Sequence, residues 1–229
     1  MMQLLSIQVG MPKAIVADVG AEGKQWQTAL FKEAVRGSVC VRFLGLDGDG
    51  QADLESHGGL DKAINAYPSE HYQYWLDELG LACEPGAFGE NFSSDGMIEA
   101  EVCVGDIYRV GELVVQVSQP RQPCWKIARR WGVKKLALFV QQTGKTGWYY
   151  RVLKEAQVSA PDVVELIDRP YPQWTIDRVN QIMYRDKRDW QAAYDLSQCS
   201  ALSESWKVTL SSRAAKQQCH SELPRLYGL

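Results

Sequence analysis

The pattern of apolar residues changes once along this chain, near Tyr171-Pro172, and this change constrains the fold more than any other feature. Before it, short runs rich in β-branched residues are separated by turns that contain glycine, such as the hairpin pattern whose turn is Gly111-Glu112. After it, apolar residues recur at helical spacing. We therefore predict a mainly β domain over residues 1–171 and a small three-helix bundle over residues 172–229.

Helices are also expected within the β region, on its periphery. One should begin after Ser69. A second is marked by Leu136, Phe139 and Val140 and should end near Gly144, because glycine readily adopts the left-handed conformation at the end of a helix. In the bundle, Thr175 and Ser203 are the expected N-caps of the first and third helices.

The charges are unevenly distributed. The chain has 25 Lys and Arg against 28 Asp and Glu, and this net charge of −3 argues against a protein that binds nucleic acid through an overall basic surface. Residues 113–154, however, contain nine basic residues and no acidic one, so the rest of the chain carries −12. A basic segment in an acidic protein suggests a local site for an anion.

The six cysteines, at 40, 83, 103, 124, 199 and 219, form no CxxC pair, and three histidines cannot complete the usual zinc patterns. We expect free thiols in a reducing compartment. No secretory signal is visible at the start, and no apolar run approaches the ~18 residues of a membrane helix. These features predict a cytoplasmic protein without a membrane partner.

Cys124 is the candidate for chemistry. It follows Pro123, and proline is favoured at the first position of a helix, so Cys124 is expected in the first turn. The positive end of that helix, together with Arg121, Lys126 and Arg129, would favour the thiolate, the form that binds a soft metal. The alternative is that Cys124 is a small packed residue.

Three other segments carry candidate ligand-binding side chains, each with a simpler alternative. His57 and Lys62 flank two glycines and could hold phosphate, or form a tight turn with solvated ends. Asn91 could recognise a polar heterocycle, or bond its own backbone. Arg151 could contact phosphate in a bidentate manner, or form a surface salt bridge. The segment 45–50 begins like a calcium loop but lacks the required later ligands, and we predict a solvated turn over Asp47–Gly50.

Seven short motifs follow one another along the chain. They are His57-Gly58-Gly59-Leu60-Asp61-Lys62, Ala66-Tyr67-Pro68, His71-Tyr72, Phe88-Gly89-Glu90-Asn91-Phe92, Val104-Gly105-Asp106, Ser118-Gln119-Pro120-Arg121 with Pro123-Cys124, and Thr143-Gly144-Lys145 with Gly147-Trp148. In this order they resemble the MOSC domain, which is named after the C-terminal domain of molybdenum cofactor sulfurases. The likeness covers most of the chain and is strongest to bacterial members that confer resistance to 6-hydroxylaminopurine.

The resemblance implies a β-barrel-like MOSC fold and a bound molybdenum cofactor, that is, molybdopterin or a nucleotide form of it. Cys124 would be the protein ligand of molybdenum. Similar proteins reduce N-hydroxylated compounds, including N-hydroxylated purine analogues, and so detoxify them. The implied reaction removes oxygen from an N–OH group with two electrons from a separate, flavin-type reductase, since no flavin or iron–sulfur motif is present in this sequence.

Motif position and charge assign further roles under this resemblance. Glu90 and Asp106 are the candidates for moving the proton that the release of water requires. The candidate cofactor-binding residues are His57, Lys62, Asn91, Ser118, Gln119, Arg121, Lys126 and Arg151.

Two other functions remain open at this point. The chain could be a carrier module that delivers molybdopterin or sulfur to another enzyme without turnover of its own. It could also act on nucleic acid through the helical bundle, but eight basic and six acidic side chains in residues 172–229 are a weak charge for DNA, and we expect no specific nucleic-acid partner. The resemblance suggests a homodimer.

Overall fold

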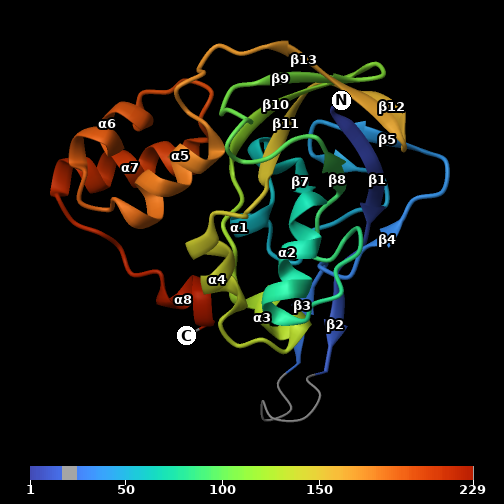
Figure 1. Ribbon diagram of the computed structural model, residues 1–229, viewed down its shortest axis with the longest axis horizontal. Coiled ribbons are helices and arrows are strands. Elements are labelled where there is room, and N and C mark those ends of the chain that lie inside the picture. The colour runs from blue at the N-terminus through green and yellow to red at the C-terminus, as the bar shows by residue number, and fades with distance from the viewer. Residues whose placement is uncertain (17–24, 229) are drawn as a thin grey trace.

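A computed structural model describes residues 1–16 and 25–228, and its main element is a closed barrel (Figure 1). Its seven strands are β1 (Gln3–Val9), β7 (Ile64–Pro68), β8 (Phe92–Asp95), β9 (Ile107–Val110), β10 (Leu113–Pro120), β11 (Trp148–Lys154) and β13 (Asp162–Asp168). They lie in the order β13-β9-β10-β11-β7-β8-β1, and β1 pairs with β13 to close the barrel. Neighbouring strands are antiparallel except β7 and β8, which are parallel.

The barrel interior is filled by the apolar runs that the sequence predicts as strands. Leu113, Val115 and Val117 of β10 are each at most 1% exposed. The hairpin between β9 and β10 turns at Gly111, whose φ of 56° lies in the left-handed region that glycine adopts without strain. The predicted mainly β fold with peripheral helices is confirmed.

Shorter strands surround the barrel. β4 (Glu33–Ala34) extends the edge of β1, and β2 (Lys13–Ile15) pairs with β3 (Trp26–Thr28). A three-stranded sheet consists of β5 (Ser38–Arg42), β6 (Gly45–Leu46) and β12 (Ala156–Ser159), in the order β12-β5-β6.

Five short helices cover the sides of the barrel: α1 (Leu54–His57), the 3₁₀ turn η1 (Leu60–Lys62), α2 (Glu70–Leu79), α3 (Trp125–Trp131) and α4 (Leu136–Thr143). Gly144 ends α4 in the left-handed conformation, as predicted, whereas Ser69 precedes α2 without a side-chain cap. α3 starts at Trp125 and not at Pro123, so Cys124 is its N-cap with an extended backbone. The prediction that Cys124 lies in the first turn is therefore wrong by one position.

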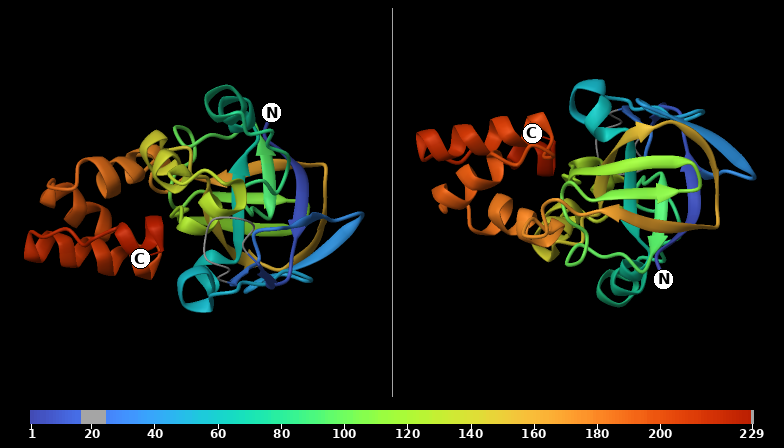
Figure 2. Two further views of the ribbon diagram at one scale, coloured as in Figure 1. Left: turned by 90° about the horizontal axis from the view of Figure 1, so that it is seen from below. Right: turned by 90° about the horizontal axis from the view of Figure 1, so that it is seen from above.

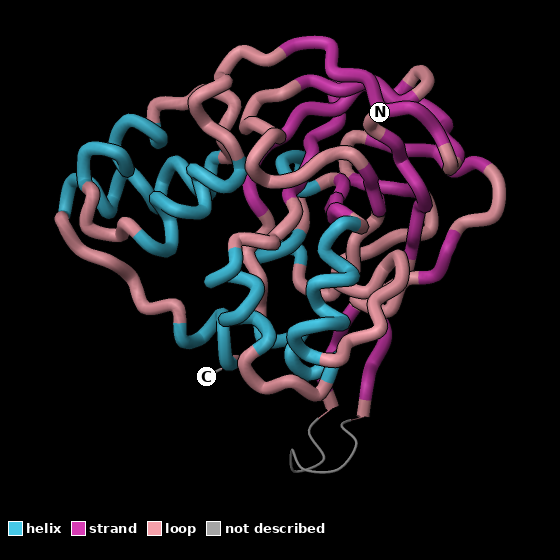
Figure 3. Tube along the Cα trace, in the orientation of Figure 1, coloured by secondary structure: helices cyan, strands magenta, loops and turns pink. Residues whose placement is uncertain are grey.

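The C-terminal part is helical and lies to one side of the barrel (Figures 2 and 3). It consists of α5 (Ile176–Asn180), which runs into the π-helical turn η2 (Gln181–Arg185), then α6 (Trp190–Ser197), α7 (Glu204–Lys216) and α8 (Leu223–Tyr227). Thr175 caps α5 by accepting the Arg178 backbone N–H at 3.1 Å. α8 leaves the other helices and packs on α3 and α4.

All six cysteines are free, as the sequence predicts. Within residues 1–16 and 25–228, no helix has the length and apolar character needed to cross a bilayer.

Candidate functional site

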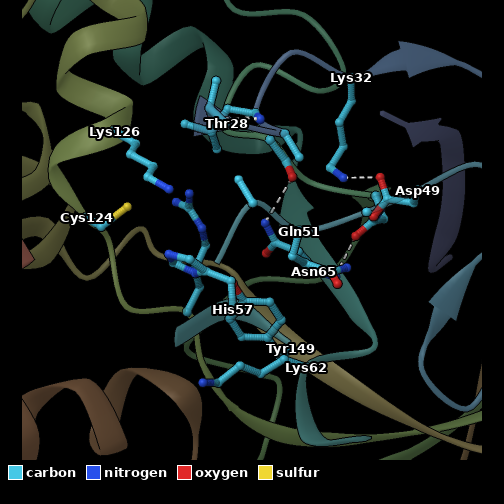
Figure 4. A pocket seen from close by; sticks show the side chains of 17 residues that line it. Thr28, Lys32, Asp49, Gln51, His57, Lys62, Asn65, Cys124, Lys126 and Tyr149 are labelled. Atoms are coloured by element: carbon cyan, nitrogen blue, oxygen red, sulfur yellow. Dashed lines mark hydrogen bonds and ion pairs between the residues drawn. The ribbon is translucent and has the colours of Figure 1, made fainter. Parts of the chain in front are cut away.

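A cavity lies where the ends of β7, β10 and β11 meet the first turn of α3 and the segments 28–32 and 49–52. Cys124 lies at its wall and is 8% exposed, and its sulfur points into the cavity (Figure 4). The side chain is oriented by the extended backbone of this N-cap position (φ −123°, ψ 165°). Cys124 is therefore not a residue of the apolar core.

Arg121 supplies a buried positive charge to the same cavity. It is 4% exposed, and its Nη2 donates to the carbonyl of Phe88 at 2.9 Å. Its Nη1 is buried and has no hydrogen-bond partner among the described residues. A buried donor without a partner is costly, so this nitrogen favours a ligand that brings an acceptor, above all an anion.

Three more basic side chains line the cavity. Lys126 lies two positions after Cys124, and its Nζ is 5.8 Å from the centroid of the Trp125 ring. Burial lowers the pKa of Lys62, although Asp61 and Asp53 oppose this effect. Burial, reinforced by the charges of Arg121 and Lys126, lowers the pKa of His57 to about 4. His57 is therefore a neutral imidazole at pH 7, not the phosphate-binding cation that the sequence suggests.

The opposite wall contains a buried ion pair between Lys32 and Asp49, whose side chains are 6% and 1% exposed (Figure 4). Burial lowers the pKa of Lys32 despite the attraction of Asp49. Asp49 also accepts the N–H of Gly10 at 2.8 Å and the side-chain amide of Asn91 at 2.9 Å. The prediction of a solvated turn over Asp47–Gly50 is wrong for Asp49, because Lys32 and Asn91 contact it from distant parts of the sequence.

Asn65 and Asn91 add two polar side chains to this wall of the cavity. The Asn91 side chain accepts the backbone N–H of Asn65 at 3.1 Å and donates to the Gln8 carbonyl at 3.2 Å. The side-chain oxygen of Asn65 is buried and has no partner among the described residues. Asn65 and Arg121 both line the cavity, and each has one buried polar atom without a partner among the described residues.

A second chamber of about 540 Å³ adjoins this cavity. His57, Lys62, Cys124, Lys126 and Tyr149 line both spaces. We call the first space the inner cavity and the second the outer chamber. The outer chamber is completed by residues of the barrel end, α7 and α8: Asp53, Glu55, Gln119, Gln122, Trp125, Ser205, Thr209, Pro224 and Arg225.

The structure brings seven of the residues selected from the sequence to these two spaces. They are His57, Lys62, Asn91, Gln119, Arg121, Cys124 and Lys126, of which Gln119 lines only the outer chamber. Sequence reasoning missed Lys32 and Asn65, for which no local motif gives a signal, and it placed Asp49 in a solvated turn.

Glu90 and Asp106 lie elsewhere and have other partners. The carboxylate of Glu90 accepts the N–H groups of Gly86 and Phe88 at 2.8 and 2.9 Å and the hydroxyl of Tyr72 at 2.6 Å. Asp106 accepts two bonds from Arg169 at 2.7 and 2.8 Å, and also binds the Cys103 N–H and the Tyr108 hydroxyl. Neither lines the inner cavity or the outer chamber, so the structure does not bring these two carboxylates to Cys124.

The side chains of Arg151 and Ser118 also bond to other residues of the protein. Arg151 pairs with Asp61 at 2.7 Å and donates to Gln116 at 3.0 Å, so the salt-bridge alternative describes it. The Ser118 hydroxyl is buried and bonds the carbonyl oxygens of Asp61 and Tyr149. Both residues hold the 57–62 segment against the barrel and line neither space.

Among the described residues, no group of three or more His, Cys, Asp and Glu is arranged to hold a metal ion. What the inner cavity provides instead is one thiol, Cys124, beside several cations. This donor set suits a metal that arrives inside an anionic organic ligand and takes a single thiolate from the protein.

The chain matches the MOSC domain family over residues 53–165 and the YiiM-like, 3-alpha helix domain over residues 174–217. It is 39% identical over 210 residues to protein YiiM of Escherichia coli (strain K12), a match that covers 90% of this chain and 92% of that protein. A protein named reductase from Gibberella moniliformis is 34% identical over 186 residues, which are 79% of this chain and 32% of that one. The crystal structure of YiiM from Geobacillus stearothermophilus aligns with a TM-score of 0.78 at 37% identity, covering 93% of this chain and 100% of that chain.

Proposed function

This chain belongs to the MOSC family and carries the YiiM-like helical domain after the barrel in sequence, and we propose that it is a molybdenum-cofactor-dependent reductase of N-hydroxylated compounds. In the reaction, R–NHOH takes up two electrons and two protons, the N–O bond breaks, and R–NH₂ and water leave. N-hydroxylated purine analogues are the proposed substrates, and detoxification is the proposed role. The name of the fungal relative supports a redox reaction.

The chemistry of the side chains around Cys124 suits the cofactor. Cys124 would supply the thiolate ligand of molybdenum, and the unused Nη1 of Arg121, together with Lys126, would bind the phosphate of molybdopterin. The unused oxygen of Asn65 would accept an N–H of the pterin ring. When bound, the cofactor supplies a two-electron centre that can remove oxygen from nitrogen.

The outer chamber would admit the substrate. Its volume of about 540 Å³ lies within the range of small-molecule sites, and it reaches Cys124. The neutral His57 can donate or accept a hydrogen bond there, which suits an N–OH group. Lys62 is the proposed proton donor in place of Glu90 and Asp106, because burial lowers the pKa of its ammonium group. The electrons are proposed to come from a separate flavin-type reductase.

The single observation that carries this proposal is the position of Cys124, where the inner cavity and the outer chamber meet. The test is expression in a host that makes molybdopterin, followed by molybdenum analysis and an assay of 6-hydroxylaminopurine reduction with a chemical reductant. Stoichiometric molybdenum and turnover are expected. Bound molybdenum that passes to an apo-enzyme without any turnover would instead identify a carrier module.

A further inference from the structure

The last helix, α8, does not belong to the three-helix bundle. It follows the region matched by the helical domain and packs on α3 and α4 (Figure 1). Its residues Pro224 and Arg225 line the outer chamber together with Cys124. Leu226 is 5% exposed and lies in the apolar cluster that includes Ile127 and Val140. A Cβ added to Gly228 would lie only 3.1 Å from the Trp125 ring, so the backbone after α8 approaches α3 closely.

Arg225 of α8 links three segments through its guanidinium group. Its Nη1 donates to the carbonyl oxygen of Pro123, which directly precedes Cys124. Its Nη2 donates to Gln141 of α4 at 2.5 Å and to Glu222 at 3.3 Å. The group also lies 5.4 Å from the ring of Tyr184. Hydrogen bonds from a charged donor are stronger than neutral ones, so this arrangement fixes the Pro123 carbonyl.

The fixed carbonyl bears directly on Cys124. The peptide plane between Pro123 and Cys124 is one of the two that set the direction of the Cys124 side chain. Cys124 is a helix N-cap without a side-chain cap bond, so its own side chain does not hold this turn. We propose that Arg225 is the positioning residue of Cys124, and that α8 is a latch which keeps the thiol at the junction of the two spaces.

The first test needs no cofactor. In protein purified without molybdopterin, Arg225→Ala should increase the rate of Cys124 alkylation by iodoacetamide at least fivefold, measured peptide by peptide by mass spectrometry. Amide hydrogen exchange should rise in peptides that cover residues 121–131. Arg225→Lys keeps a charged donor and should restore part of the protection. Arg178→Ala, which removes an exposed ion pair with Asp186, is the matched control and should change neither quantity.

Cys199 serves as an internal control, because it is 3% exposed and lies in the helical bundle. General unfolding would speed alkylation of Cys199 and Cys124 together, whereas a lost latch affects Cys124 alone. An unchanged Cys124 rate in a folded Arg225→Ala protein would overturn the proposal. The proposal would also be overturned if the alkylation rates of Cys199 and Cys124 rose equally in both the Arg225→Ala and the Arg225→Lys protein.

The consequence for activity rests on the proposed function. In the loaded enzyme, Arg225→Ala should lower kcat by tenfold or more, because a displaced thiol holds the metal poorly, and Arg225→Lys should recover part of it. A protein without reductase activity would refute the proposed function and leave the alkylation result standing. The positioning role of Arg225 and the proposed reductase function can therefore be refuted independently of each other.

Discussion

Asp61 and Arg151 form an ion pair of 2.7 Å at the place where the barrel meets the helical domain. The second carboxylate oxygen of Asp61 accepts the backbone N–H of Glu204, the first residue of α7, at 3.2 Å. Asp61 is part of the motif that contains His57 and Lys62, so one side chain connects the cavity wall to the helix that lines the outer chamber.

Arg151→Gln should lower stability and leave the cofactor site intact. The pair is half-buried, with side chains 19% and 32% exposed, and charged hydrogen bonds contribute about 1.5–3 kcal/mol each. We expect a loss of about 1–3 kcal/mol in the free energy of unfolding. Arg109→Gln, which removes an exposed ion pair with Glu165, should cost under about 1 kcal/mol. Chemical denaturation measures both, and equal losses would contradict this assignment.

Arg121→Gln should empty the cofactor site. The substitution removes the buried charge and the unused Nη1 donor, so we expect at least a tenfold lower molybdenum content per chain after expression in a molybdopterin-producing host. Arg151→Gln is the control, because both arginines belong to the same basic segment but Arg151 lies outside the cavity. Full molybdenum content in Arg121→Gln would show that Arg121 does not bind the cofactor.

His57 should make the apo-protein less stable in acid. Its pKa in the folded protein is about 4, below the ordinary value of 6.5, so the unfolded chain takes up the proton first. This contribution to stability is present above pH 6.5 and is lost as the pH falls towards 4, at no more than about 1.4 kcal/mol per pH unit. His57→Gln should flatten the pH dependence of urea unfolding in this window, whereas the exposed His220→Gln should not. Parallel curves for His57→Gln and the wild type would refute a neutral buried imidazole.

Gly147→Ala should disrupt the close contact between the segment before β11 and strand β7. Gly147 has a φ of 65°, and an added Cβ would lie 2.2 Å from the Ala66 carbonyl oxygen of the neighbouring strand β7. Gly132→Ala is a matched control, because its φ is 68° and no atom lies within 4 Å. Gly132→Ala should lower the free energy of unfolding only by the cost of a side chain in the left-handed conformation, about 1–2 kcal/mol. Gly147→Ala should lower the free energy of unfolding clearly more. Equal melting temperatures of the two variants would contradict this expectation, because they would show that the backbone around Gly147 can shift at little cost.

Much of the fold follows from the sequence because its signals are local. The β9–β10 hairpin is specified by two apolar runs around Gly111, and the end of α4 by Gly144. The start of α3 was placed too early because Pro123 is compatible both with a first helical turn and with the extended segment before it.

The sequence predicts the site only where the functional side chains lie close together in one segment of the chain. Cys124, Arg121 and Lys126 are neighbours in sequence, and all three reach the inner cavity. The Lys32–Asp49 pair joins residues 17 positions apart, and a local pattern carries no signal for it. Charge and motif position also do not reveal that Arg151 forms an ion pair with Asp61.

The outer chamber could not be foreseen for the same reason. It is lined by the barrel, by Thr209 of α7 and by Arg225 of α8, which follow Cys124 by 85 or more positions. The sequence indicates that helices follow the barrel but not which of their faces returns to the site.

The central claim is that Cys124 is the ligand through which this chain uses molybdenum. The most direct measurement compares the wild type with Cys124→Ser and Cys219→Ser, all expressed in a molybdopterin-producing host, for molybdenum content and for the rate of 6-hydroxylaminopurine reduction. Cys219 is exposed and lies outside both spaces, so its variant should match the wild type. Cys124→Ser should lose turnover by a factor of a thousand or more. Wild-type turnover in folded Cys124→Ser protein would contradict the account.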